Sequence, residues 1–210
     1  MSELDKYKIL EQFNVSRETY HILDDLKKEI LLKNSKINLI SKNTESNFIE
    51  RHTIDCAQVI DFIDLNQKKC TDIGSGAGLP GLVIAIILKS KNLNMKVDLY
   101  EKSYHKGEFL KYLSKKLKLN VEVFQKDIFK EKNLNSGTLF CRAFKPLPII
   151  LELVEKNFKD YSNLVVFMGK SGKQILESTT KKWDLEYKKT KSITNEDSFL
   201  INFRKIKKND

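Results

Sequence analysis

The sequence predicts one α/β domain, with a mostly parallel seven-stranded sheet, an antiparallel edge and an N-terminal helical appendage. From Lys69 onward, short apolar strands alternate with helical segments, which is typical of a parallel sheet covered on both faces. The last two strand-like runs have no helix between them, which predicts a hairpin at the edge of the sheet. We therefore expect a helical appendage over residues 1–66, packed on the same domain as residues 67–210.

The appendage is expected to contain three helices. Residues 2–13 would form a short helix, and Ser16 is a candidate N-cap for a second helix that reaches Asn34. Residues 45–65 would form the third helix, because its apolar residues recur at helical spacing. This apolar face would carry Phe48, Ile49, His52, Cys56, Val59, Ile60 and Ile63.

The rest of the chain alternates between the two kinds of element. Strands are expected over residues 69–73, 97–101, 121–124, 138–142, 163–168, 183–191 and 198–204. Helices are expected over residues 80–90, 104–119, 147–157 and 171–181. Right-handed crossovers would give a doubly wound sheet that binds its ligand beyond the carboxyl ends of the strands. The tail from Lys205 to Asp210 is expected to be loose.

Composition limits the cellular setting. The three cysteines, Cys56, Cys70 and Cys141, are far apart and show no metal-ligand spacing, which indicates a reducing compartment and no metal site. No stretch approaches the roughly 20 apolar residues of a membrane span, and no apolar run follows a basic N-terminus. We expect a cytoplasmic protein with no membrane partner.

The glycine loop after the first strand is the strongest motif in the chain. Gly74, Gly76 and Gly78 alternate after Asp72, and glycine allows positive φ and close approach of a ligand. Pro80 suits the first turn of a helix, whose free N–H groups would face the loop. Three glycines cost about 0.5 to 1 kcal/mol each in chain entropy, so a nucleotide-like ligand is favoured over a turn without one.

Two ligand classes fit this loop. Gly76–Gly81 is a literal G-x-G-x-x-G, and Glu101 lies 20 residues beyond Gly81, as in the dinucleotide site of an NAD(P)-dependent oxidoreductase. In an S-adenosylmethionine site the glycines would wrap the amino-acid end of the cofactor, and Glu101 would take the ribose hydroxyls. Asp72 favours the second class, because its carboxylate can anchor a cationic amino group, directly or through water, but would repel a pyrophosphate.

Residues at the other strand ends complete the candidate site. Asp127 and Ile128 follow the third strand, and Arg142 ends the fourth. Because the carboxyl ends of parallel strands share one edge, we expect the carboxylates of Asp72, Glu101 and Asp127 to rim a single cavity.

The charge points to a polyanionic partner. The net charge of +10 and pI near 9.3 favour nucleic acid, although scattered surface lysines explain part of the excess. Only four arginines occur, at positions 17, 51, 142 and 204, and a guanidinium holds phosphate or a base edge better than lysine does. A basic RNA-binding module without catalysis is therefore a third possibility.

Three motifs, in this order and spacing, carry a family resemblance. They are Glu50-Arg-His-Thr-Ile-Asp-Cys56, Asp72-Ile-Gly-Ser-Gly-Ala-Gly-Leu-Pro-Gly81 and Arg142-Ala-Phe144. With them the chain resembles the bacterial ribosomal small subunit methyltransferase G family, also called glucose-inhibited division protein B. The resemblance runs from about Asn34 to Lys170 and, with the last two strands, covers nearly the whole chain.

The resemblance implies a Rossmann-like class I S-adenosylmethionine methyltransferase. Its reaction would be methylation of guanine N7 in the 530 loop of 16S rRNA, at guanosine 527 in the family's naming. The substrate would be 16S rRNA, free or within a 30S subunit or an assembly intermediate, and the enzyme is expected to be a monomer.

The resemblance also assigns residues. Cofactor contacts fall by motif position on Gly74, Leu79, Asp127, Ile128 and Arg142, with Glu101 at the ribose. Lys170 falls where the family carries a lysine after the fifth strand, which makes it a candidate contact for RNA phosphate. The chain departs from the family at Lys33 and Ile40, where a tryptophan and a threonine are usual, and at the pair Asp127-Ile128, of which Asp127 is the better candidate for the adenine contact.

No side chain is expected to act as an acid, a base or a nucleophile. Guanine N7 carries an in-plane lone pair and loses no proton when it attacks, so alignment matters more than a general base. Arg51, His52 and Arg142 would orient the base or phosphate, and Asp55 would hold Arg51 in place. From the residues alone, the favoured interpretation of His52 is a histidine of the helix face, packed against Phe48 and Cys56.

Overall fold

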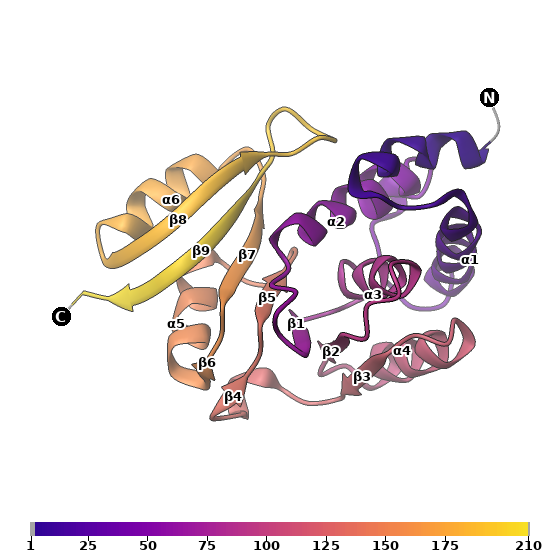
Figure 1. The fold of residues 1–210 in the computed structure, drawn as a ribbon. Coiled ribbons are helices and arrows are strands. Elements are labelled where there is room, and N and C mark those ends of the chain that lie inside the picture. The colour runs from indigo at the N-terminus through magenta and orange to yellow at the C-terminus, as the bar shows by residue number, and fades with distance from the viewer. Residues whose placement is uncertain (1–2, 210) are drawn as a thin grey trace.

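The computed structural model describes residues 3–209, and its centre is a twisted seven-stranded sheet with helices on both faces (Figure 1). The strand order is β3-β2-β1-β5-β7-β9-β8, and β9 runs antiparallel to both of its neighbours. A dinucleotide-binding sheet has the all-parallel order 3-2-1-4-5-6 instead. The antiparallel strand inserted near the edge therefore confirms the predicted fold class and argues against the dinucleotide fold.

The sheet strands lie close to their predicted positions. They are β1 (Lys69–Ile73), β2 (Lys96–Tyr100), β3 (Val121–Phe124), β5 (Thr138–Cys141), β7 (Asn163–Met168), β8 (Trp183–Lys191) and β9 (Phe199–Lys208). A separate parallel pair, β4 (Leu134–Asn135) and β6 (Phe158–Asp160), was not predicted. Strands of two or three residues are too short to show a periodic pattern.

The helices also follow the predicted order. The long ones are α1 (Arg17–Asn34), α3 (Gly81–Ser90), α4 (Tyr104–Lys116), α5 (Leu147–Asn157) and α6 (Gly172–Thr180). The first segment, η1 (Glu3–Phe13), is a 3₁₀ helix, and the short turns are η2 (Lys42–Thr44) and η5 (Ile128–Lys130). Ser16 precedes α1 in an extended conformation, as an N-cap does, but its hydroxyl contacts Thr19 Oγ1 at 3.2 Å rather than a backbone N–H.

The third predicted helix is not a regular α-helix. It begins at Ile49 as a π-helix, η3 (Ile49–Ile54), continues as α2 (Asp55–Ala57) and ends as a 3₁₀ helix, η4 (Gln58–Phe62). Sequence periodicity detects the helix but not this change of winding. Single-turn π segments are frequent at functional sites.

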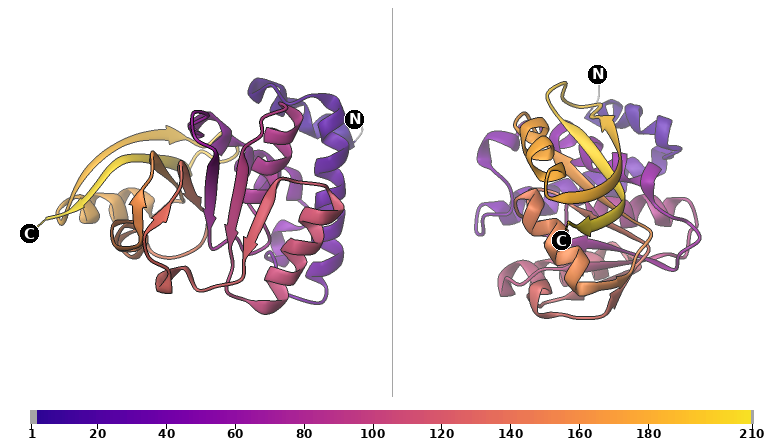
Figure 2. Two further views of the ribbon diagram at one scale, coloured as in Figure 1. Left: turned by 60° about the horizontal axis from the view of Figure 1, so that its bottom comes forward. Right: turned by 90° about the vertical axis from the view of Figure 1, so that its left-hand side faces the viewer.

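Two apolar cores lie on opposite faces of the sheet, and Figure 2 shows the helices that cover these faces. The N-terminal helices, α3 and α4 build the first core, whereas α5 and α6 cover the opposite face around β7 and β9. Among residues 3–209, no helix is long and apolar enough to cross a bilayer.

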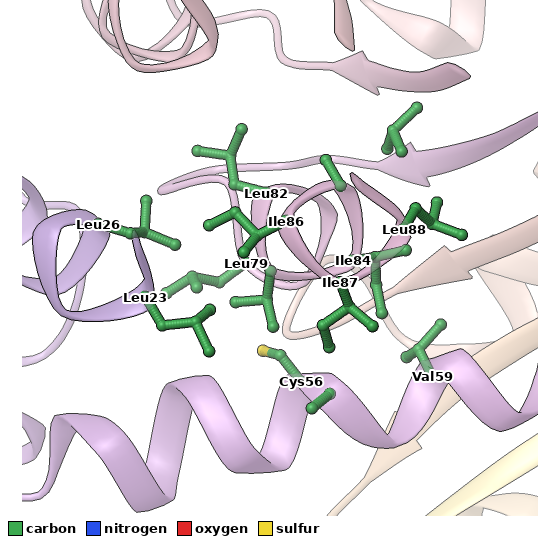
Figure 3. Close-up of a cluster of buried hydrophobic side chains, with 14 of the residues drawn as sticks. Leu23, Leu26, Cys56, Val59, Leu79, Leu82, Ile84, Ile86, Ile87 and Leu88 are labelled. Carbon is green, nitrogen blue, oxygen red and sulfur yellow. The ribbon is translucent and has the colours of Figure 1, made fainter. Parts of the chain in front are cut away.

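Helix α3 lies at the centre of the first core. Every residue from Gly81 to Leu88 is buried, because the sheet covers one side of the helix and the N-terminal helices cover the other. Figure 3 shows Leu82 and Ile86 of α3 close to Leu23 and Leu26 of α1, with Cys56 below them and Val59 beside Ile84 and Ile87. The helix that follows the glycine loop is thus fixed on all sides.

The prediction of a loose C-terminal tail was wrong over residues 205–208. These residues extend β9 and pair with the start of β8, Trp183 opposite Lys208 and Leu185 opposite Ile206. Alternating lysines hide the strand pattern, but Ile206 and Trp183 are only 8% and 4% exposed. Asp210 lies outside the described residues.

Truncation after Arg204 tests this strand extension. It leaves the start of β8 unpaired and exposes Trp183, which should lower the free energy of unfolding by about 2 kcal/mol. Trp183 is the only tryptophan in the chain, so its fluorescence emission should shift to the red. Truncation after Lys208 is the matched control and should change neither value. Unchanged emission after the longer truncation would contradict the pairing.

Candidate cofactor and substrate site

The glycine loop joins β1 to α3, and its three alternating glycines all have positive φ: 74° at Gly74, 55° at Gly76 and 87° at Gly78. Two of them are required by packing. A Cβ on Gly74 would lie 2.1 Å from the ring of Phe144, and one on Gly78 would lie 2.4 Å from Leu82. These two glycines let the loop lie directly on its neighbours.

Gly76 has a different environment. The nearest atom to an added Cβ would be the Gly74 carbonyl oxygen, 3.9 Å away, so the space beside this residue is open. Its N–H donates to Oε2 of Glu101 at 2.9 Å, while Oε1 of Glu101 accepts from the N–H of Ser103 at 2.8 Å. The acid after the second strand is therefore held against the loop, as the spacing predicted.

Asp72 supports the loop from beneath. Its side chain is almost completely buried, and its Oδ2 accepts a hydrogen bond of 2.9 Å from the N–H of Gly81, at the start of α3. Burial raises the pKa of this carboxyl to about 7, although the Gly81 N–H favours the charged form. In this conformation Asp72 fixes the loop and does not reach the cavity wall, so its predicted contact with the cofactor amino group stays a prediction.

A cavity of about 560 Å³ opens beside the loop, at the carboxyl ends of the strands. Gly74, Gly76 and Leu79 line one side, as predicted, and the end of β7 lines another. Segment 39–44, the third helix and the β8–β9 loop close the remaining sides. The β8–β9 loop reaches across the carboxyl edge of the sheet toward the N-terminal helices in Figure 1.

Arg142 lies at the centre of the polar wall of this cavity. Its Nε donates to Oδ2 of Asp55 at 3.1 Å, and its Nη2 donates to the carbonyl of Arg51 at 2.6 Å. Its Nη1 lies 3.2 Å from Nδ1 of His52, and the guanidinium stacks over Phe167 at 5.8 Å. Arg142, which follows β5, is thus fixed to η3 and α2.

His52 is part of the same network. Arginine only donates, so Nδ1 of His52 accepts the bond from Arg142, and Nε2 carries the hydrogen directed at Thr44 Oγ1, 2.8 Å away. Burial, together with the charges of Arg142 and Arg51, lowers the pKa of His52 to about 4. The ring also packs on Phe48, at 5.1 Å between centroids. His52 is therefore neutral at pH 7, with both nitrogens engaged.

The predicted partner of Asp55 was wrong. Its carboxylate binds Arg142 rather than Arg51, because it faces the end of β5 while the Arg51 side chain is exposed. Its other oxygen accepts bonds from Gln58, Ser192 and Thr194, at 3.1, 3.2 and 2.9 Å. Sequence reasoning missed Thr44, which binds His52, and also Ser192 and Thr194, which bind a residue more than 100 positions away, since no local pattern marks such hydroxyls.

Three other basic side chains lie near the cavity. Arg51 lines it and, among the described residues, its guanidinium forms no ion pair. Lys106, near the start of α4, also lines the cavity and was not predicted. Lys170 is exposed and lies outside the cavity wall, although the preceding Gly169 belongs to it.

The two residues after β3, Asp127 and Ile128, differ in burial. Ile128 is 3% exposed and packs in the second core, so its side chain is not available to a ligand. Asp127 is half-buried, and its Oδ1 accepts a bond of 3.2 Å from the N–H of Phe129. The contact of Asp127 and Ile128 with the cofactor stays a prediction, and Ile128 could make it only through its backbone.

The expected rim of three carboxylates is also corrected. Asp72 is turned beneath the loop, Glu101 is bound to Gly76, and neither they nor Asp127 line the cavity. The only carboxylate in the wall, within the described part of the chain, is that of Asp55, which is already engaged by four donors. The site is thus an open glycine cradle opposite a wall of arginine and neutral histidine, suited to hold a nucleotide-like ligand beside an anionic substrate.

Comparisons with known proteins show the family of this chain. The family model described as rRNA small subunit methyltransferase G matches residues 19–199. A relative from Pelagibacter ubique (strain HTCC1062), named ribosomal RNA small subunit methyltransferase G, is 53% identical over 99% of both chains. A relative of the same name from Rickettsia akari (strain Hartford) is 32% identical over 92% of this chain and 98% of its own.

Solved structures share the fold at low identity. A SAM-dependent methyltransferase from Aquifex aeolicus matches with a TM-score of 0.56 and 16% identity, over 77% of this chain and 94% of its own. The 16S rRNA methylase RmtB matches with a TM-score of 0.52 and 12% identity, over 91% of this chain and 76% of its own. The arrangement of sheet and helices is therefore that of class I methyltransferases.

The raised pKa of Asp72 predicts a specific pH dependence of stability. Between its ordinary pKa of 3.8 and about 7, the folded state binds a proton that the unfolded chain releases, so this group's contribution to stability falls as pH rises. Asp72→Asn keeps an acceptor for Gly81 but cannot titrate. Its free energy of unfolding relative to wild type should rise with pH, by at most about 1.4 kcal/mol per pH unit. Urea denaturation at pH 5, 6 and 7 measures this difference, and a constant difference would contradict the assignment.

Proposed function

The chain belongs to the rRNA small subunit methyltransferase G family, and we propose that it transfers a methyl group from S-adenosylmethionine to guanine N7 in the 530 loop of 16S rRNA. The observation that carries this proposal is the cavity beside the glycine loop, whose opposite wall is cationic. The chain is a methyltransferase that uses S-adenosylmethionine, as its family and fold require.

The residues around the loop fit this cofactor. The open space at Gly76 would be filled by a side chain at any other residue type, and the cavity continues along Leu79. We propose that Gly74–Leu79 and Arg142 hold the amino-acid end, Glu101 the ribose and Asp127 the adenine. The bound cofactor supplies a methyl group on a positively charged sulfur, which is ready for transfer to a nucleophile.

The protein's own side chains would then orient the substrate. Guanine N7 attacks with a lone pair and needs no proton removed, so the reaction depends on alignment. His52 and Asp55 are the titratable residues beside Arg142. Neither can act as a base, because the hydrogen bonds to Arg142 and Thr44 already occupy them. Arg51 is free to bind phosphate or guanine O6, and N7 must stay clear of any donor for the reaction to proceed.

The family supports a proposal for the partner and the setting. We propose that the substrate is 16S rRNA, free or within a 30S subunit or assembly intermediate, and that a monomer acts on it in the cytoplasm. Lys170 and Lys106 would contact RNA phosphate at the mouth of the cavity. Residues 1–66 are proposed as an appendage that completes the substrate side of the site, with residues 67–210 holding the cofactor.

Labelled-methyl transfer tests the proposed reaction. Ribosomal particles and free 16S rRNA from a strain lacking this protein should accept methyl from S-adenosylmethionine, and the label should map to guanine N7 in the 530 loop. Gly76→Val should transfer none, because its side chain would stand in the cavity. Methylation elsewhere, or cofactor binding without transfer to any ribosomal RNA, would refute the proposal.

Substitution of the two arginines separates binding from alignment. Arg51→Ala should lower methyl transfer by about 100-fold and leave the Kd for S-adenosylhomocysteine unchanged, since this side chain is free to serve the RNA. Arg142→Ala should lower methyl transfer and raise the Kd for S-adenosylhomocysteine, because it also releases Asp55 and His52 beside the loop. Arg17→Ala and Arg204→Ala are the controls. Full activity in both cavity variants would refute these roles.

A further inference from the structure

A groove of about 370 Å³ lies between α1 and α4. Figure 2 shows the two helices side by side, and Glu29 of α1 joins them by accepting bonds from Tyr112 and Lys116 of α4, at 3.1 and 2.7 Å. The volume falls within the roughly 300 to 1,000 Å³ of ligand pockets. None of the sequence motifs assigns a role to this groove.

The groove meets the mouth of the cofactor cavity at the start of α4. His105 lines the groove, and the next residue, Lys106, lines the cavity. The segment after α1 makes the same connection, since Ile37 lines the groove and Leu39 lines the cavity. A polymer that leaves the cavity on this side would therefore enter the groove.

The acids in the wall of the groove are already compensated. Glu29 is bound by Lys116, and this hydrogen bond holds the pKa of the Glu29 carboxyl below its ordinary value. Glu108 accepts a bond of 2.8 Å from Lys111. Because a lysine outside the wall pairs with each acid, neither acid opposes the approach of an anion with its full charge.

The lysines in and beside the groove have no such partners. Lys33 and Lys36 belong to its wall, and neither forms an ion pair within residues 3–209. Lys106, at the mouth of the cavity, has no acidic partner in this part of the chain either. Uncompensated cations therefore lead from the groove to the cavity, an arrangement that suits a chain of phosphates.

Apolar side chains are also unusually exposed here. Leu32 and Tyr104 are the two most exposed large apolar side chains among the described residues, at 70% and 66%. Leu32 lines the groove, and Tyr104 directly precedes His105 at its end. The rings of Tyr104 and His105 meet at 78°, and this contact covers at most one face of the tyrosine. An open aromatic face beside unpaired cations is suited to stack on an unpaired base.

We propose that this groove binds single-stranded RNA that flanks the methylated nucleotide. Tyr104 would stack on a base, Leu32 would pack against a neighbouring nucleotide, and Lys33, Lys36 and Lys106 would contact phosphates. RNA is favoured over a protein partner because the same cations lead into the cavity where the RNA is proposed to react. This inference rests on the proposed rRNA substrate and adds a surface that holds it outside the cavity.

Removal of the two wall lysines tests the phosphate contacts. Lys33→Gln/Lys36→Gln should raise the Kd for 16S rRNA about tenfold, and the slope of log K against log salt should become shallower by about 1.4, since each phosphate of a single strand contributes about 0.7. Lys132→Gln/Lys159→Gln removes the same charge from exposed positions before β4 and on β6, and should change neither value. The Kd for S-adenosylhomocysteine should stay within about twofold of wild type in both.

Substitution of Tyr104 tests the stacking. Tyr104→Ala should raise the Kd for 16S rRNA about tenfold, whereas Tyr104→Phe, which keeps the ring, should bind like wild type. Methyl transfer at saturating RNA should be equally fast in all three proteins, because the groove holds the substrate outside the cavity. The free energy of unfolding should also be equal, since the ring is largely exposed.

A crosslink identifies what occupies the groove. The three native cysteines are at most 1% exposed, so Leu32→Cys gives a singly accessible thiol for benzophenone maleimide. On irradiation with 30S particles from a strain lacking this protein, or with free 16S rRNA, the label should crosslink to RNA. The control is labelled Leu65→Cys, at a leucine 58% exposed that precedes β1, and it should not crosslink.

The outcomes separate the groove from the reaction. Unchanged RNA binding by the lysine and tyrosine variants, or a Leu32→Cys label that crosslinks to ribosomal protein alone or to nothing, would overturn the groove while methyl transfer by wild type stands. Loss of S-adenosylhomocysteine binding in these variants would also overturn it, because the surface would then serve the cofactor. Failure of wild type to methylate rRNA would refute the proposed function, whereas a crosslink to RNA would still support the groove.

Discussion

The contact between Arg142 and Asp55 is the interaction on which the site depends most. It joins the end of a central strand to a helix 87 residues earlier in the chain, and Asp55 extends the connection to the β8–β9 loop through Ser192 and Thr194. Both side chains are largely buried, so loss of either partner leaves a charge without compensation, at a cost of about 3 to 5 kcal/mol before any screening by solvent. One ion pair thereby holds three distant segments around a single cavity.

The glycine loop is held by a second, independent set of bonds. Asp72 binds the N–H of Gly81 from beneath the loop, and Glu101 binds the N–H of Gly76 from its side. Helix α3, buried on every side, gives these bonds a fixed base. Because the protein supplies both restraints, the loop keeps its shape without a ligand, and little ordering is left for cofactor binding to impose.

The sequence predicted the sheet well because each strand carries its own apolar run and turn signals. It also placed Gly76, Leu79 and Arg142 at one cavity, since strand ends of a parallel sheet meet at one edge. It failed where long-range contacts decide the outcome. The partner of Asp55 and the pairing of residues 205–208 both depend on groups distant in sequence. The end of the β5–β7 pairing at Cys141 and Val166 also has no local signal, because both strands are ordinary runs of apolar residues.

The structure distinguishes cations that form ion pairs within the protein from cations that do not, which composition alone cannot do. Away from the site, lysines such as Lys69, Lys96 and Lys116 form ion pairs with neighbouring acids, and much of their charge is compensated within the protein. At the mouth of the cavity, Arg51 and Lys106 have no acidic partner in the described chain, and neither has Lys170 nearby. Arg142 is half-buried and paired with Asp55, so it positions neighbouring groups more than it attracts anions. Association with RNA through these uncompensated cations should weaken with added salt more strongly than cofactor binding does.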